Sequence, residues 1–368
     1  MNIDFHFATT YVIARTAGFN PDEARIIAHS SQYVDDATHG GVINFDNRAI
    51  YQRISSSHKM LDYRNFKSLA NHQVWIPFHF LPGNGGKKAG ENPKGKFINK
   101  LVCRPNSPVA QDMVKLCVES KEKKFSLHLL GITMHVYADT WAHQGFAGCL
   151  HKVNHVENLK DHEGKKNKDM LEKISNFFGD KFDELTSKLV DDVSPLGHGA
   201  ALSYPDKPYL KWSYINGLGE EIFRDNPKDF LAAADHMHQW MRKFIKGNSS
   251  TQEEGLPEGE RSKLFDLFIK IQDDDENKRL HKWLQHIENG FFAFGPENVS
   301  YIHKGSNSWK HRALLNPIEM ENGDEQKHIF KYHNEFMTSN WKLFHDALQF
   351  HRYNVLHLIL PDYNICAA

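Results

Sequence analysis

FSLHLLGITMHVYADTWAHQGFAG, residues 125–148, is apolar on nearly every side of the helix that it predicts. A helix that is apolar all round is typical of the buried core of a protein. Three histidines and an aspartate are set into this run, and they are His128, His135, Asp139 and His143. At 100° per residue, their side chains fall within a stripe of roughly 80° on one face of the helix. The segment therefore predicts a buried central helix that carries a single polar stripe.

The carboxylate in this stripe is the reason to expect a metal ion. Asp139 lies about one turn, or ~6 Å, from both His135 and His143. A buried carboxylate is costly unless something compensates it, and a divalent cation held by His and Asp does so directly. The alternative is an Asp–His hydrogen-bonded pair in a polar seam, but His143 on the same face favours a metal. His128 is more than two turns from His143, so we expect it to support the site from outside or to be structural.

Composition agrees with a metal-binding helical protein. Of the 368 residues 24 are histidine, the commonest metal ligand, and 45 basic side chains nearly balance 46 acidic ones. No global field would therefore recruit nucleic acid or an acidic membrane, and we find no clear nucleic-acid patch. The four cysteines are scattered without a C-x-x-C pair, which argues against a thiolate zinc site and fits a reducing compartment.

The chain has no window of 18 uninterrupted apolar residues, so we expect no transmembrane segment. Its first residues, MNIDFHFATTYVIARTAGF, lack the basic region and apolar core of a secretory signal. These features predict a cytoplasmic protein, or one that is exported without a cleaved signal peptide.

Helical patterns dominate on both sides of the central helix, and alternating runs typical of strands are scarce. Asn20-Pro21-Asp22-Glu23 predicts a helix start with Asn20 as the N-cap and Glu23 three residues later, and that helix should end near Asp35 or Asp36. Further helices are predicted at 8–17, 108–120, 123–147, 167–190, 227–246, 261–289 and 325–358. We therefore expect a mainly α, multi-helix globular fold with long loops.

Two stretches read as loops, namely 81–96 and 247–260, which are rich in small and polar residues and have no periodicity. We expect residues 1–246 to form a metal-binding α-helical core and 247–260 to be a loop or linker. Residues 261–368 would then be a C-terminal helical extension packed on the same domain.

Other acids and histidines are candidates to complete the metal site. Asp35 and Asp36 end a helix at the negative end of its macrodipole, where carboxylates are unfavourable unless a cation is near; a solvated last turn is the alternative. His79 stands in WIPFHFLPG between apolar neighbours and prolines, which suits a rigid ligand or a packed histidine bonded to a carbonyl. His6 in IDFHF and His198 in PLGHGAALSYPD are weaker candidates when each is taken singly. The case for them as ligands rests on all of these residues together.

The order of these residues resembles that of the zinc-dependent phospholipase C and single-strand nuclease superfamily, an all-helical, three-zinc fold of phosphodiesterases. The resemblance implies a zinc site of Asp36 (or Asp35), His79, His135 and Asp139, a second ion that Asp139 bridges with His6, and a third served by His143 and His198. Between one and three ions would be bound.

The match covers scattered positions across 1–206 and departs from the family's pattern in three places. His143 follows Asp139 more closely than in the family, and the family's usual N-terminal Trp is absent. Leu202 stands where the family has an acid after His198, so Asp206 is the candidate substitute. The motifs DFHF, SQYVDDAT, PFHFLPG and LGHG also resemble a group of uncharacterised bacterial proteins.

The resemblance implies a metal-dependent hydrolase that attacks a phosphoester, such as a phospholipid headgroup or a nucleotide, with metal-activated water. Asp35 or Asp36, whichever is not a ligand, would be catalytic and take the proton of the water. One alternative is an HD-type phosphohydrolase, for which His345-Asp346 is the correctly ordered dyad. Another is a non-enzymatic, metal-stabilised helical binding protein whose C-terminal helices contact a protein partner. Metal count and openness of the site would separate these hypotheses.

Overall fold

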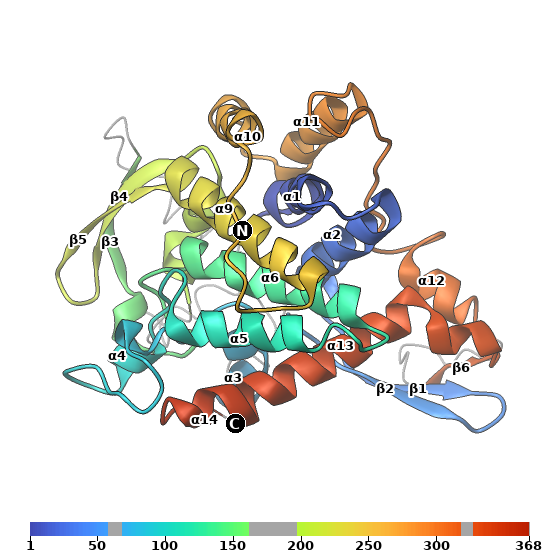
Figure 1. Ribbon diagram of the computed structural model, residues 1–368. Coiled ribbons are helices and arrows are strands. Elements are labelled where there is room, and N and C mark those ends of the chain that lie inside the picture. The colour runs from blue at the N-terminus through green and yellow to red at the C-terminus, as the bar shows by residue number, and fades with distance from the viewer. Residues whose placement is uncertain (58–67, 162–196, 318–326, 368) are drawn as a thin grey trace, which may run out of the picture.

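A computed structural model of the chain describes residues 1–57, 68–161, 197–317 and 327–367 (Figure 1). About half of the chain is helical, which confirms that helix dominates, but two small three-stranded sheets make the fold mixed rather than purely α. The helix expected at 167–190 lies outside the described residues.

The central helix is α6 (Ser126–Ala142), and every residue of it from His128 to Ala142 is buried, as the sequence predicts. Figure 1 shows it surrounded by other helices on several sides. Its helical neighbours are α2 (Pro21–Asp36), α5 (Pro108–Glu119), α9 (Asn226–Lys246) and α13 (Asn340–Asn354). The polar stripe of α6 therefore lies in the middle of the molecule.

Helix α2 begins with the capping box that its sequence predicts. The Asn20 side chain accepts hydrogen bonds from the N–H groups of Asp22 and Glu23, each at 3.0 Å, and the Glu23 carboxylate accepts from the Asn20 N–H at 3.1 Å. Further along, α2 crosses α6 at Gly131, where an added Cβ would lie 2.3 Å from the carbonyl oxygen of Ile27. Only glycine permits this close crossing, which brings the end of α2 to the polar stripe of α6.

Two of the predicted C-terminal helices have different bounds. The range 261–289 forms two helices, α10 (Glu258–Lys270) and α11 (Glu276–Glu288), because Asp275 caps a new helix start by accepting from the N–H of Asn277. In the range 325–358, α13 begins only at Asn340, after the N-cap Ser339. It continues as a π-helical turn at Val355–Ile359 and ends with α14 (Leu360–Asp362).

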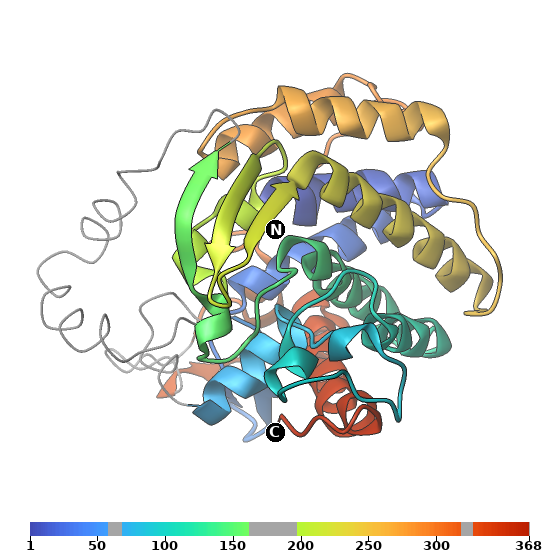
Figure 2. The ribbon, with the colours of Figure 1, turned by 90° about the vertical axis from the view of Figure 1, so that its left-hand side faces the viewer.

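The two sheets consist of strands of two to six residues, too short to give a clear alternating pattern. One has the order β2-β1-β6, with β1 (Gly41–Phe45) antiparallel to β2 (Ile50–Arg53) and parallel to β6 (Ile329–Phe330). The other is the antiparallel sheet β3-β4-β5, which stands to the left of the helices in Figure 2. Its strands are Val156–Asp161, Lys211–Asn216 and Glu221–Asp225.

A large apolar cluster joins the first and last parts of the chain, since it includes residues from Met1 to Ala367. Helices α10 and α11 lie beside α9 and the N-terminal segment (Figures 1 and 2). A smaller cluster around Phe80, Phe146 and Trp212 lies under the second sheet. The remaining helices are α1 (Thr10–Ala17), α3 (Ser68–Phe78), α4 (Ile98–Leu101) and α12 (Trp309–Leu314).

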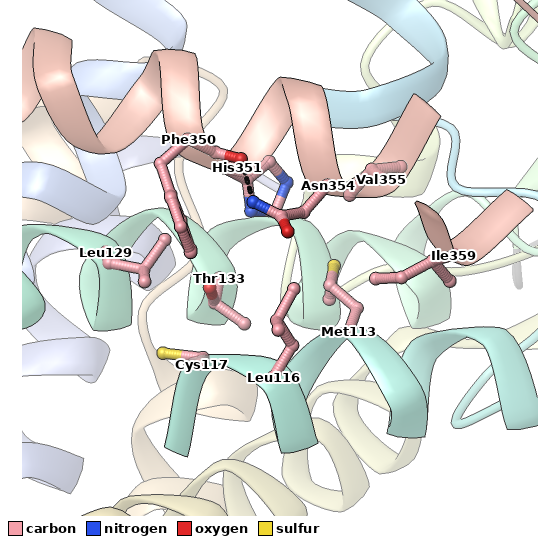
Figure 3. A pocket seen from close by; sticks show the side chains of 10 residues that line it. All are labelled: Met113, Leu116, Cys117, Leu129, Thr133, Phe350, His351, Asn354, Val355 and Ile359. Atoms are coloured by element: carbon pink, nitrogen blue, oxygen red, sulfur yellow. Dashed lines mark hydrogen bonds between the residues drawn. The ribbon is translucent and has the colours of Figure 1, made fainter. Parts of the chain in front are cut away.

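Helices α5, α6 and α13 enclose a small cavity of about 10 Å³, lined by Leu129, Thr133 and His351 among others (Figure 3). This volume is at the lower limit for one water molecule, so the cavity is a packing gap and not a ligand site. Within the described residues, no helix has both the length and the apolar character needed to span a bilayer.

Candidate metal centre

The first residue of the centre comes from a π-helical turn (Asp4–Thr9) that precedes α1 and is buried throughout. Such turns are rare and often occur at functional sites. The turn carries His6, whose ring stacks on that of His135 with 3.8 Å between centroids. His6 Nε2 lies 3.2 Å from Asp139 Oδ1. The N-terminal segment therefore reaches the polar stripe of α6.

Imidazole and carboxylate side chains meet in three groups, within each of which one ligand atom per residue lies within 4.8 Å of the others. His135 belongs to two of these groups. They are His6/Asp35/His135, His79/His135/Asp139 and His143/His198/Asp206. The structure thus brings together all of the sequence-predicted metal ligands except Asp36.

Asp36 is in none of the three groups, although the sequence offers it as a ligand or catalytic acid. Its carboxylate accepts a hydrogen bond from the hydroxyl of Tyr301 and another from the Gln32 amide. Asp35, the other candidate at the end of α2, faces the histidines instead, with Oδ1 at 3.7 Å from His79 Nδ1 and 3.8 Å from His135 Nε2.

Asp139 is the most enclosed acid of the centre, with a side chain that is 1% exposed. Its Oδ2 lies 3.3 Å from His135 Nε2, 3.5 Å from His79 Nδ1 and 3.6 Å from a nitrogen of His143. Burial alone would raise the pKa of Asp139, but His143 and the Met1 amine lower it well below its ordinary value. The group is therefore a carboxylate that depends on nearby positive charge.

Backbone carbonyls fix the proton position on His79. Its Nε2 lies 2.9 Å from the carbonyl oxygen of Ser56, so Nε2 carries the hydrogen and donates it. In the neutral ring, Nδ1 then presents a lone pair toward Asp139, Asp35 and His135 Nε2, the last at 3.3 Å. Metal-binding histidines are commonly oriented by such a bond from their other nitrogen.

The same arrangement recurs in the third group. His143 donates from Nδ1 to the carbonyl oxygen of His79 at 2.7 Å, and His198 donates from Nδ1 to that of Leu202 at 2.8 Å. If the rings are neutral, both Nε2 lone pairs face Asp206, at 3.2 Å from Oδ1 and 3.4 Å from Oδ2 respectively. Lone pairs against a carboxylate repel unless a cation lies between them.

Burial is the largest cause of the other pKa shifts in the centre. It lowers the pKa of His135 and of His198 to about 4 in each case, and it lowers the pKa of His6 well below its ordinary value. Burial also raises the pKa of Asp35 well above its ordinary value, helped by the other acids and opposed by the Met1 amine. His6, His135 and His198 are thus held neutral, which is the form that binds a metal.

The residues fit a divalent metal. Among the buried side-chain atoms that the structure describes, His6 Nε2 and Asp139 Oδ2 face the centre and have no hydrogen-bond partner. An unpartnered buried polar atom costs about 1–3 kcal/mol, which a cation at this position would relieve. A donor set of imidazoles and carboxylates without thiolate suits zinc or a similar divalent ion.

Solvent reaches the centre unevenly. The side chain of Asp35 is 33% exposed and that of His198 is 19% exposed, whereas His79 and Asp139 are at most 5% exposed. Solvent therefore reaches the centre at Asp35, at the end of α2, and at His198, whereas His79 and Asp139 in the middle of the centre are buried.

Sequence reasoning identified some participants only in part. Asp206 appears there as a substitute acid, and the structure pairs it with both His143 and His198. The carbonyl groups that orient the rings have no sequence signal at all. The Met1 nitrogen lies 2.7 Å from Asp139 Oδ1 and 3.2 Å from Asp206 Oδ1.

Two other predicted positions lie apart from the three groups. His128 Nε2 bonds to the side-chain oxygen of Asn340 at 3.1 Å. In the His345-Asp346 dyad, His345 is buried beside Trp341, and Asp346 accepts a hydrogen bond from Tyr51 and pairs with Lys342.

Fold and site together define a mainly helical protein with a candidate metal centre of histidine and aspartate. The chain belongs to a family of unknown function, DUF6765, whose sequence model matches residues 1–359. A search of curated proteins and a search of solved structures each found no match to the chain.

Proposed function

We propose that this protein is a metal-dependent hydrolase of phosphoric esters, with zinc as the metal that its donor set suits best. The observation that carries the proposal is the meeting of buried carboxylates with imidazole nitrogens whose protons are already donated elsewhere. The order of the ligands along the chain supports a relationship in fold to the zinc-dependent phospholipase C and single-strand nuclease superfamily.

Three ion positions follow from the three groups. His79, His135 and Asp139 would hold one ion, and His6 with Asp35 would hold a second that Asp139 Oδ1 also approaches. The third set is His143, His198 and Asp206. Divalent ions held in this way supply a lowered pKa for a water molecule and compensate the charge of phosphoryl oxygens.

The protein side chains would then position the ester and take up the proton of the attacking water. Asp35 is the most exposed acid of the centre, so the carboxylate oxygen of Asp35 that does not hold the ion would take up the proton that the attacking water loses. His198, which is also partly exposed, would contact the ester. A small phosphoester, such as a lipid headgroup or a nucleotide, would be the substrate.

One observation favours a second candidate function, a non-enzymatic helical protein that a metal stabilises. His79, His135 and Asp139 are all buried, and a site closed by protein ligands is typical of structural zinc. The C-terminal helices would then contact a protein partner.

Metal analysis of the purified protein, followed by hydrolysis of chromogenic phosphomonoesters and phosphodiesters, tests the proposal. We expect two or three divalent ions per chain and turnover of at least one ester class. Asp139→Asn should lower the metal content and abolish turnover. The matched control is Asp346→Asn, which removes the acid of the HD-type dyad and should retain metal and turnover.

Each other outcome decides between the hypotheses. A metal-free native protein ends the proposal, and unchanged metal content in Asp139→Asn removes that residue from the centre. One bound ion without turnover favours the structural role. Loss of activity in Asp346→Asn alone favours the HD-type alternative.

A further inference from the structure

Arg279, in the first turn of α11, is a fully buried arginine outside the three groups of the metal centre. Its Nε donates to Asp4 Oδ2 at 2.8 Å, and its Nη2 lies 3.3 Å from Asp4 Oδ1. This two-pronged ion pair fastens α11 to the π-helical turn that carries His6. A buried guanidinium is costly unless its hydrogen bonds are satisfied, so its surroundings are built to hold it.

Arg279 also reaches two segments of the centre through Asn2. Its Nη2 donates to the side-chain oxygen of Asn2 at 2.7 Å. The carbonyl oxygen of Asn2 accepts from the N–H of His6 at 3.0 Å, and the N–H of Asn2 donates to the carbonyl oxygen of Asp206 at 3.3 Å. One side chain thus connects α11 to the backbone of two candidate ligands that are far apart in sequence.

The loop before α11 also contacts the segment that follows Asp206. The carbonyl oxygen of Asp273 accepts from Arg279 Nη1 at 2.6 Å and from the hydroxyl of Tyr209 at 3.2 Å. Lys207, directly after Asp206, forms an ion pair with Asp274. The residues around Arg279 therefore contact the chain at Asp206 and directly after it.

We propose that Arg279 is a positioning residue for the metal centre, which holds His6 and Asp206 at the separation that their ions require. The inference rests on the proposed function, because it presumes that the groups bind metal. It gives the C-terminal part of the chain a role in the chemistry, since α11 supplies the tie. Losing a partner that orients ligands typically weakens metal binding by about 10–100-fold.

A matched ion pair provides the control. Arg15 of α1 pairs with Glu297, with Nη2 at 2.7 Å from Oε1, and it also joins the N-terminal helices to the chain beyond α11. Neither residue belongs to a group of the metal centre. Arg15→Gln should therefore lower stability, as Arg279→Gln does, without changing metal affinity.

The test compares the wild type with Arg279→Gln, Arg279→Lys, Asn2→Ala and Arg15→Gln. Zinc affinity is measured by competition with a chelator at a temperature where circular dichroism shows each variant folded, and cobalt(II) substitution reports ligand geometry through its visible spectrum. We expect Arg279→Gln to bind zinc about 10–100-fold more weakly and to change the cobalt spectrum. Arg279→Lys should recover part of the affinity, because an ammonium still pairs with Asp4 but lacks the fork.

Failure of the inference is distinguishable from failure of the proposed function. A wild type that binds no zinc overturns the function itself. Wild-type affinity and spectrum in Arg279→Gln, or an equal loss of affinity in Arg15→Gln, overturn the positioning role while the function stands. If Arg279→Gln does not fold, Asn2→Ala and Arg279→Lys decide: wild-type affinity in both overturns the inference, and weakened affinity in both supports it.

Discussion

Helices α2 and α6 contribute residues to two sets of buried histidines, and the sets differ in whether carboxylates face the rings. The metal centre has Asp35 and Asp139 among its rings. His29 and His128 lie about two turns away on the same helices. We call them the aromatic histidine pair because both contact Trp309. His29 stacks on the Trp309 ring at 3.8 Å, and His128 lies at 5.4 Å from it.

The aromatic histidine pair shows what burial does to an imidazole without an acid. Burial lowers the pKa of His29 to about 3 and that of His128 to about 4, so both rings are neutral at physiological pH. Neither residue belongs to a group of ring nitrogens and carboxylates within the described part of the chain. A buried neutral ring is tolerated as an aromatic side chain, whereas the added carboxylates of the metal centre need a cation.

Metal removal should give the largest difference between the two sets. When the free concentration of an ion is a thousandfold above its Kd, we expect its chelation to lower the free energy of unfolding by about 4 kcal/mol. Calorimetry of zinc-loaded and chelated protein measures this as a lower Tm, which added zinc should restore. His128→Gln is the matched control and should show the same zinc-dependent shift, since His128 binds Asn340 and no ion. Equal Tm values with and without zinc would contradict the metal centre.

Lowering the pH should lower the free energy of unfolding through the aromatic histidine pair. The folded pKa of His128, about 4, is below the ordinary value of 6.5, so the unfolded chain binds a proton that the folded chain refuses. The contribution of His128 to the free energy of unfolding is therefore complete above pH 6.5. It is lost as the pH falls toward 4, by about 3 kcal/mol in all.

Urea unfolding of the chelated protein at several pH values between 4.5 and 6 measures this effect. We expect His128→Gln to reduce the slope of unfolding free energy against pH by about 1.4 kcal/mol per unit, because glutamine does not titrate. Metal-free protein is used so that metal release does not add to the slope. Identical slopes in the two proteins would show that His128 is not held neutral by burial.

Local signals account for the parts of the molecule that the sequence predicts. The apolar run of α6 and the capping box at Asn20 each lie within one segment, and both helices form where expected. The Asp275 cap that separates α10 from α11 is also local, and it was missed because the apolar pattern continues beyond it. The pairing of Asn44 with Ile329 joins distant segments and leaves no local pattern.

The choice between Asp35 and Asp36 shows why the centre itself is less predictable. Adjacent residues on a helix point about 100° apart, so only the way α2 crosses α6 decides which carboxylate faces the histidines. Asp206 meets His143 from 63 residues away, and a pairing at that separation leaves no local pattern in the sequence. Residue type and order suggest the ligands, but the packing of the helices selects them.

Gly131→Ala tests that dependence on helix packing in both histidine sets together. The new Cβ would lie 2.3 Å from the carbonyl oxygen of Ile27 and 2.6 Å from Ser30 Cβ, so α2 and α6 would move apart. Overpacking of this kind typically costs about 1–3 kcal/mol. We expect that loss in urea unfolding together with weaker binding of the ion that His6 and Asp35 would hold. Wild-type stability and zinc affinity in this variant would mean that the crossing does not set the site.

Asn20→Ala should have the smallest effect and should separate stability from metal binding. The substitution removes the cap at the far end of α2 from Asp35, and losing such a cap typically costs about 1 kcal/mol. Because α2 is anchored against α6 at Gly131, between the cap and Asp35, fraying at Asn20 should stop before it reaches either histidine set. We therefore expect a lower urea midpoint with unchanged zinc stoichiometry and affinity. If zinc affinity falls with the midpoint, α2 responds as one unit, and the difference between the two histidine sets depends on the stability of the whole helix as well as on the carboxylates.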